Sequence, residues 1–183
     1  HIPREAEFMV MLRKKTGWYT GRGPCTAGAI IAGAGPELRR AIGDFGEAMA
    51  IAFQIRDDLL NLTSSERDAE VAPGITSGAY GKERGGDIAE GKRTLILIDL
   101  LRKCSSAEAA EVLEILHQDR QCTSPAQIER VISLVEHYGC MAFAEGVCRQ
   151  QAELSLHHLQ ALPATEAREL LREMLEFLVQ RAF

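Results

Sequence analysis

The sequence predicts an all-α protein on two observations. Apolar residues recur at three- and four-residue intervals over most of the chain, which is the spacing of one buried helix face. Residues 94–98 could form a strand by propensity, but no second segment offers a partner strand, so they are assigned to a helix. At 183 residues, with 46% hydrophobic content, the chain is expected to form one domain with a core.

The first helix is predicted near residues 5–16, where Phe8, Met11 and Leu12 share one side, and it is expected to end at Gly17. Residues near 24–34 are small and apolar, which suits a close crossing of two helices.

A long helix is predicted from about residue 37 to 62. Its apolar residues follow the helical spacing: Leu38, Ile42, Phe45, Met49 and Phe53. Four polar residues of its second half fall within an arc of roughly 100°: Gln54, Asp57, Asp58 and Asn61. The apolar residues expected on the opposite side are Phe45, Met49, Ala52, Phe53, Leu59 and Leu60. Carboxylate and amide oxygens gathered on one face are suited to Mg²⁺, which completes its octahedron with waters and phosphates.

Residues 63–91 have no periodic face and are rich in glycine. Connections of this length in compact domains are usually functional lids or disordered segments. Lys82 lies within the segment and Lys92 directly follows it, and lysines bind phosphate as point charges. We therefore expect a mobile lid over a phosphate-bearing ligand. Helices are predicted to resume near 93–103, 106–117, 125–159 and 165–181, the last with Thr165 as N-cap.

Composition excludes several classes of function. The net charge of −5 gives no basic field for nucleic acid, and the apolar stretches are too short to span a membrane. Five cysteines without a Cys-x-x-Cys pair are expected to be small buried residues in a reducing, cytoplasmic compartment.

The motifs resemble those of the trans-isoprenyl diphosphate synthases, also called polyprenyl synthetases. The second aspartate-rich motif of that family, Phe-Gln-x-x-Asp-Asp-x-x-Asp, is similar to residues 53–61, with Asn61 in place of the last Asp. The Lys-Thr pair of the family resembles Lys15-Thr16, and its Gly-Lys-x-x-Gly-x-Asp-Ile-x-x-Gly-Lys stretch resembles residues 81–92. The resemblance is strongest to geranylgeranyl-type members and covers nearly the whole chain.

The resemblance implies a fold and a reaction. The fold is the antiparallel helix bundle of isoprenoid synthases, of which residues 1–183 would be the C-terminal part, because nothing before Phe53 supplies the first aspartate-rich motif. The reaction is the Mg²⁺-dependent condensation of an allylic diphosphate with isopentenyl diphosphate, carried out by a homodimer. The chain as given is expected to be inactive alone.

The resemblance also implies a role for each candidate residue. Asp57 would ligate Mg²⁺ directly, and Asp58 and Asn61 directly or through water. Lys15 and Lys92 would contact the allylic diphosphate, with Lys82 joining from the loop. Thr16 and Gln54 would aim their oxygen dipoles at the cationic carbon, and Phe53 would lie near the second substrate.

Three other functions share features with this sequence. Residues 86–93 nearly match a P-loop, but no hydrophobic strand precedes them and Arg93 replaces the Ser or Thr. A terpene cyclase of the same fold would need a final carboxylate where Ser65 stands. A non-catalytic subunit that keeps the fold while a partner supplies the chemistry stays open, since Asn61 and the missing first motif both permit it.

Overall fold

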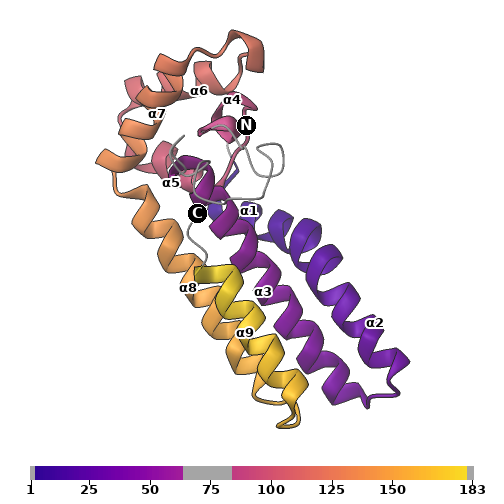
Figure 1. Cartoon of the computed structure of the whole chain (residues 1–183). Coiled ribbons are helices and arrows are strands. Elements are labelled where there is room, and N and C mark those ends of the chain that lie inside the picture. Colours follow the sequence, from indigo (N-terminus) through magenta and orange to yellow (C-terminus); the bar gives the residue numbers. More distant parts are fainter. Residues whose placement is uncertain (1–2, 64–83, 181–183) are drawn as a thin grey trace, which may run out of the picture. The chain divides into compact units, whose positions relative to one another are not determined.

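The structure is a computed structural model that describes residues 3–63 and 84–180. These residues form helices and no strand (Figure 1), so the all-α prediction is confirmed. None of the helices within them is both long and apolar enough to cross a membrane.

The contacts within the chain divide it into two compact units. The described residues of the first, here called the bundle unit, are 4–56 and 145–180. Those of the second, the small-helix unit, are Pro3, 57–63 and 84–144. The helices α3 (Pro36–Thr63) and α8 (Cys140–Leu159) each contribute residues to both units.

The bundle unit begins with one continuous helical run. It consists of α1 (Glu5–Leu12), the π-helical segment η1 (Arg13–Arg22) and α2 (Gly23–Ile31). The prediction that the first helix ends at Gly17 is therefore wrong. Phe8 and Leu12 are buried as expected, whereas Met11 is 44% exposed.

The glycines of η1 permit a close approach to α3 rather than ending a helix. A Cβ on Gly21 would lie 2.0 Å from the carbonyl oxygen of Gly46, and a Cβ on Gly46 would lie 2.6 Å from Cys25 Sγ. Only glycine leaves room for a backbone this near. The predicted crossing of small residues is thus confirmed where α2 begins, although none of the residues of α2 is buried.

The core of the bundle unit lies between α3, α8 and α9 (Glu166–Gln180), which run side by side (Figure 1). Phe45, Leu159 and Leu175 are its buried centre. The hydroxyl of Ser155 donates to the carbonyl oxygen of Phe45 at 2.9 Å, which satisfies a polar group inside this core. The long predicted helix is confirmed, since α3 spans 28 residues.

The small-helix unit is built from short helices. They are α4 (Gly86–Ala89), α5 (Leu95–Lys103), α6 (Ser106–Leu116), η3 (Arg120–Cys122) and α7 (Pro125–His137). The segment α4 packs on α6 and α7, and α5 packs on α7. The fully buried side chains between them include Ile88, Leu97, Leu100, Val112 and Val131.

Glycine does end a helix near residue 139. The prediction of one helix over residues 125–159 is wrong, because α7 stops at His137 and α8 starts at Cys140. Gly139 has φ +65°, a left-handed conformation in which helices commonly end.

The cysteines are free thiols, but they are not all buried. Cys140 and Cys148 are buried, Cys25 and Cys104 are half-buried, and Cys122 is exposed. The expectation of five buried cysteines is therefore wrong for Cys122, which lies in η3.

Candidate functional site

The C-terminal end of α3, which carries the aspartate-rich motif, is largely covered by other parts of the chain. Asp58 and Asn61 are only 7% and 3% exposed, while Asp57 is half-buried. The expectation that α3 turns its polar face away from the interior is wrong here. Residues that follow the undescribed part of the chain lie against it, because the N–H of Gly85 donates to Asn61 O at 2.8 Å and Arg84 Nε donates to Leu62 O at 2.9 Å.

Two hydrogen bonds link the aspartate-rich motif to Lys92. The backbone N–H of Asp87 donates to Oδ1 of Asn61 at 3.0 Å. The ammonium of Lys92 donates to Oδ1 of Asp87 at 2.6 Å. Two motifs that are 26 residues apart in sequence therefore meet in the small-helix unit.

Residues 84–91 differ from the loop that the sequence predicts. Residues 86–89 form α4, and residues 85–89 are all buried. Residues 64–83, which include Lys82, lie outside the described residues, so a lid over the ligand stays a prediction.

Lys92 contacts a second carboxylate, that of Glu90, at 2.8 Å. Glu90 in turn contacts Arg120 Nη1 at 2.5 Å. Partial burial of the Lys92 ammonium disfavours its charged form, but the hydrogen bonds that the ammonium donates to Asp87 and Glu90 outweigh burial and raise the pKa of Lys92 above its ordinary value. Lys92 therefore stays a cation at neutral pH. The sequence singled out Lys92, but Glu90 and Arg120 carried no motif signal.

The other predicted substrate residues belong to the bundle unit. Lys15 is exposed and Thr16 is 7% exposed, and both lie in η1. Phe53 and Gln54 are half-buried on α3. π-Helical segments are rare and are often found at functional sites, so the local winding at Lys15-Thr16 agrees with a functional role.

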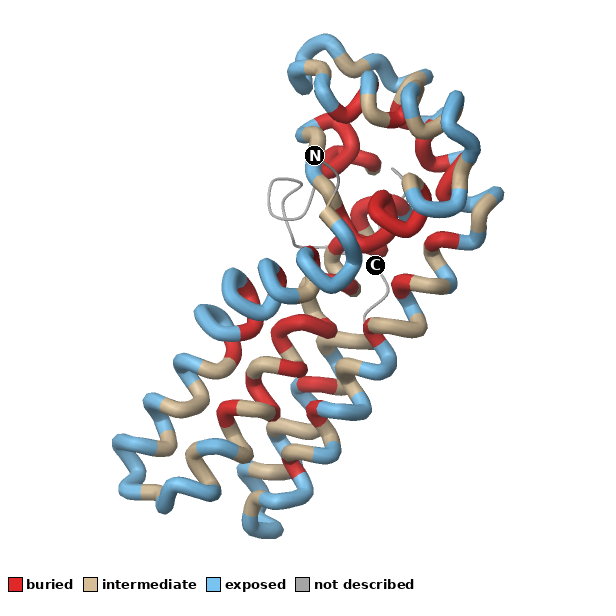
Figure 2. Tube along the Cα trace, turned by 180° about the vertical axis from the view of Figure 1, so that it is seen from behind, coloured by how far each residue is buried: buried red, intermediate tan, exposed pale blue. Residues whose placement is uncertain are grey.

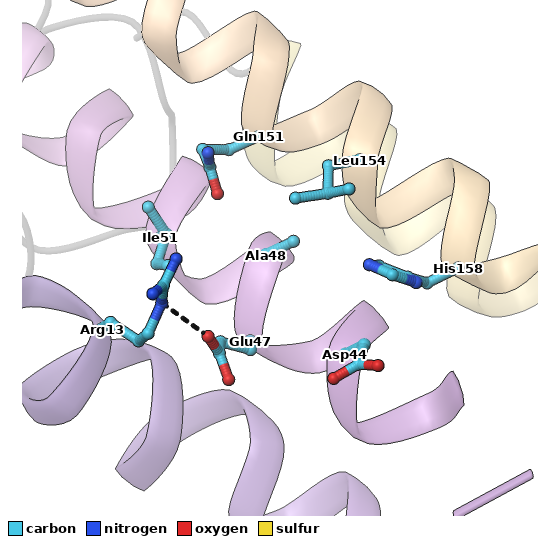
Figure 3. A pocket seen from close by; sticks show the side chains of 8 residues that line it. All are labelled: Arg13, Asp44, Glu47, Ala48, Ile51, Gln151, Leu154 and His158. Atoms are coloured by element: carbon cyan, nitrogen blue, oxygen red, sulfur yellow. Dashed lines mark ion pairs between the residues drawn. The ribbon is translucent and has the colours of Figure 1, made fainter. Parts of the chain in front are cut away.

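A cleft of about 280 Å³ opens in the bundle unit between η1, α3 and α8 (Figure 3). The residues that line it are Arg13, Asp44, Glu47, Ala48, Ile51, Gln151, Leu154 and His158. Glu47 contacts Arg13 Nε at 2.9 Å and Arg22 Nε at 2.9 Å. These pairs join residues more than 20 positions apart, which no local pattern in the sequence reveals.

The donor set at the end of α3 fits Mg²⁺. Among residues 3–63 and 84–180, no group of three or more His, Cys, Asp or Glu side chains could hold a metal. Mg²⁺ does not require such a group, because it commonly binds through one or two carboxylates and takes its other ligands from water and phosphate. Asp57 and Asp58 meet that requirement, whereas Oδ1 of Asn61 already accepts the Asp87 N–H.

Comparison with known proteins identifies relatives along nearly the whole chain. A short chain isoprenyl diphosphate synthase of Methanothermobacter thermautotrophicus is 30% identical over 177 residues, which are 97% of this chain and 50% of that protein. A geranylgeranyl pyrophosphate synthase of Geoglobus acetivorans is 29% identical over 97% of this chain and 49% of its own length. The chain thus spans about half the length of these curated relatives.

Solved structures of similar proteins agree with the fold. The geranylgeranyl pyrophosphate synthetase of Pyrococcus horikoshii superposes with a TM-score of 0.81 at 27% identity, over 98% of this chain and 50% of that one. The geranylgeranyl pyrophosphate synthase of Corynebacterium glutamicum, solved with isoprenyl diphosphate and magnesium, gives a TM-score of 0.78 at 30% identity. It covers 93% of this chain and 45% of its own.

The family profile named polyprenyl synthetase matches residues 2–135, which include the aspartate-rich motif and Lys92. With its all-helical fold and these relatives, the chain belongs to the polyprenyl synthetase family.

Proposed function

We propose that the chain is the diphosphate-binding part of a Mg²⁺-dependent trans-prenyl diphosphate synthase. The enzyme condenses an allylic diphosphate with isopentenyl diphosphate to make a longer isoprenyl diphosphate. It acts as a cytoplasmic homodimer, and this chain contributes about half of its length.

One observation carries the proposal, namely the link from Asn61 through Asp87 to Lys92. It gathers a cation and the oxygen donors at the end of α3 in one unit. A diphosphate leaving group needs both, because its developing negative charge is best stabilised by fixed cations and a metal. The Corynebacterium glutamicum relative, solved with isoprenyl diphosphate and magnesium, supports the same ligand class.

The chain's own residues have separate tasks. Asp57 and Asp58 would hold Mg²⁺, with Asn61 contributing directly or through water, and the ion would neutralise charge on the leaving diphosphate. Lys92 and Lys15 bind the diphosphate oxygens, and Lys82 adds a third cation. Thr16 and Gln54 present oxygen dipoles to the allylic cation, and Phe53 lies beside the isopentenyl group.

Binding of magnesium pyrophosphate to the purified chain tests the proposal. Isothermal titration calorimetry is expected to detect binding that Lys92→Met weakens by at least about tenfold, since a charged hydrogen bond contributes about 1.5–3 kcal/mol. Lys14→Met is the matched control, because it also removes a lysine charge but lies outside the assigned set. A wild-type affinity equal to that of Lys92→Met contradicts the assignment of Lys92.

An isoprenyl transfer assay tests whether the chain holds only part of the residues that catalysis needs. The purified chain, supplied with Mg²⁺ and both diphosphates, is expected to give no product, because the first aspartate-rich motif is not in it. Measurable product would contradict this expectation. A folded chain that binds no magnesium pyrophosphate would favour the non-catalytic subunit instead.

A further inference from the structure

The two carboxylates that contact Lys92 differ in their surroundings. The side chain of Asp87 is 10% exposed, whereas that of Glu90 is 39% exposed. Their distances to the ammonium are similar, at 2.6 Å and 2.8 Å. Burial therefore distinguishes the two contacts, and distance does not.

Asp87 is held in place by its backbone. Its N–H donates to Oδ1 of Asn61 at 3.0 Å, and its carbonyl oxygen accepts the backbone N–H of Lys92 at 3.0 Å. The turn around it depends on left-handed glycines, with φ +74° at Gly85 and +65° at Gly91. With main chain and side chain both engaged, Asp87 has little freedom to leave Lys92.

Glu90 has an alternative cation. Its Oε1 contacts Arg120 Nη1 at 2.5 Å, while its Oε2 contacts Lys92. It can therefore release Lys92 and keep an ion pair with Arg120. Exposed pairs of this kind are weak, typically about 0–1 kcal/mol, so a polyanion can displace the carboxylate.

We propose that Asp87 is a positioning residue that holds the Lys92 ammonium ready for a diphosphate, and that Glu90 competes with the diphosphate for the same ammonium. The inference rests on the proposed function, in which Lys92 binds a diphosphate. Arrival of the diphosphate breaks the Glu90–Lys92 contact, while the Glu90–Arg120 and Asp87–Lys92 contacts stay in place.

The two neutralising substitutions are expected to act in opposite directions. Asp87→Asn weakens the binding of magnesium pyrophosphate by about tenfold, because the charged hydrogen bond that orders Lys92 is lost. Glu90→Gln tightens it about two- to fivefold, because a competing exposed carboxylate is removed. Each substitution deletes one negative charge, so net charge alone would make both tighten the binding of a polyanion.

Calorimetric titration of the purified chain with magnesium pyrophosphate measures these affinities. Glu111→Gln is the matched control, since Glu111 pairs with Arg130 at 3.1 Å elsewhere in the small-helix unit, and it is expected to leave the affinity unchanged. Tighter binding by both Asp87→Asn and Glu90→Gln, or no change in either, overturns the inference.

A double-substitution cycle separates positioning from a general loss of structure. Asp87→Asn combined with Lys92→Met is expected to bind no more weakly than Lys92→Met alone, because Asp87 acts through Lys92. An additive loss overturns the positioning role. Helical circular dichroism checks that each variant is folded.

A readout without phosphate separates this inference from the proposed function. Reductive methylation with ¹³C-formaldehyde keeps the lysine charge and gives each ammonium a nuclear magnetic resonance signal, and Lys92→Arg identifies the signal of Lys92. The wild-type signal is expected to have a chemical shift distinct from those of exposed lysines, and in Asp87→Asn it is expected to coincide with them.

A wild-type Lys92 signal that already coincides with exposed lysines overturns the positioning role, even if pyrophosphate binds. If the Lys92 signal is distinct but the chain binds no pyrophosphate, the proposed function and the competition by Glu90 are overturned. The same result supports the positioning of Lys92 by Asp87.

Discussion

The two units differ in what they bury and in what they expose. Most of the buried polar side chains among the described residues belong to the small-helix unit: Asp58, Asn61, Asp87, Thr94 and Asp99. The large apolar side chains that are exposed in the described part of the chain all belong to the bundle unit: Val10, Met11, Trp18, Tyr19, Ile30, Ile31, Leu154, Leu170, Met174 and Phe177. Figure 2 colours each described residue along the backbone by how far it is buried.

This difference separates a unit organised around polar contacts from a unit with uncovered apolar surface. Buried polar groups are tolerated only when they are hydrogen-bonded, so the small-helix unit depends on specific partners. Exposed apolar surface is typical of regions that contact other protein.

The largest expected effect concerns the glycine crossing of the bundle unit. Gly21→Ala places a Cβ 2.0 Å from the Gly46 carbonyl oxygen, so the helices must separate. We expect a loss of about 2–3 kcal/mol in the free energy of unfolding, typical of overpacking. Urea unfolding followed by helical circular dichroism measures it.

Gly28→Ala is the control for that experiment. Gly28 lies within α2 and an added Cβ there meets nothing within 4 Å, so helix propensity alone predicts a gain of about 0.5–1 kcal/mol. Equal effects at positions 21 and 28 would show that the crossing contributes nothing to stability.

A smaller effect is expected at the buried ion cluster of the small-helix unit. Asp99 is 2% exposed and contacts Arg102 Nη2 at 2.7 Å and Lys103 Nζ at 2.6 Å. Burial alone would raise the pKa of Asp99, but its hydrogen bonds to Lys103 and Arg102 outweigh burial and lower the pKa below its ordinary value. Asp99→Asn is expected to cost about 1.5–2 kcal/mol at pH 7, because two cations lose their charged partner.

The pH dependence of that cost has a definite sign. Because the folded-state pKa is lowered, the contribution of Asp99 is complete above its unfolded pKa of about 3.9 and is lost as the pH falls through the folded value. Urea unfolding between pH 7 and pH 2 should show the gap between wild type and Asp99→Asn closing only below about pH 4. A gap that does not change with pH would contradict the ion-pair account, and Asp119→Asn in an exposed position serves as control.

The smallest effect on stability, and the sharpest on surface properties, is expected for the exposed apolar residues. Tyr19 and Ile31 are 85% and 87% exposed, so replacing both with Gln should change the free energy of unfolding by less than about 0.5 kcal/mol each. The same pair should reduce the fluorescence of a hydrophobic dye bound to the native chain. An undiminished signal would mean that the dye binds elsewhere and that this surface is not accessible.

The sequence predicted those parts of the structure that local patterns determine. The helix α3 was predictable because its apolar residues repeat at helical spacing, and the helix predicted near 93–103 is present as α5. The aspartate-rich motif and Lys92 could be singled out because carboxylates suit a metal ion and lysines suit phosphate, and the structure links the two through Asp87.

The errors arose where distant contacts override local signals. Gly17 was interpreted as a helix end, whereas a Cβ there would lie 3.1 Å from Glu47 Cγ, so the residue serves packing. Gly139, which does end a helix, was not recognised. Asn61 is contacted by a segment more than 20 residues later in the chain, which periodicity along α3 cannot reveal.

The wide winding of η1 has a consequence for how the chain tolerates changes in length. Its backbone turns more slowly than an α-helix, so residues four and five apart, rather than three and four apart, come into line along one side. Removing one residue between Arg13 and Arg22 would tighten the coil and rotate everything that follows. Gly21 could then no longer face Gly46, so a deletion anywhere in this stretch should disturb the close approach to α3.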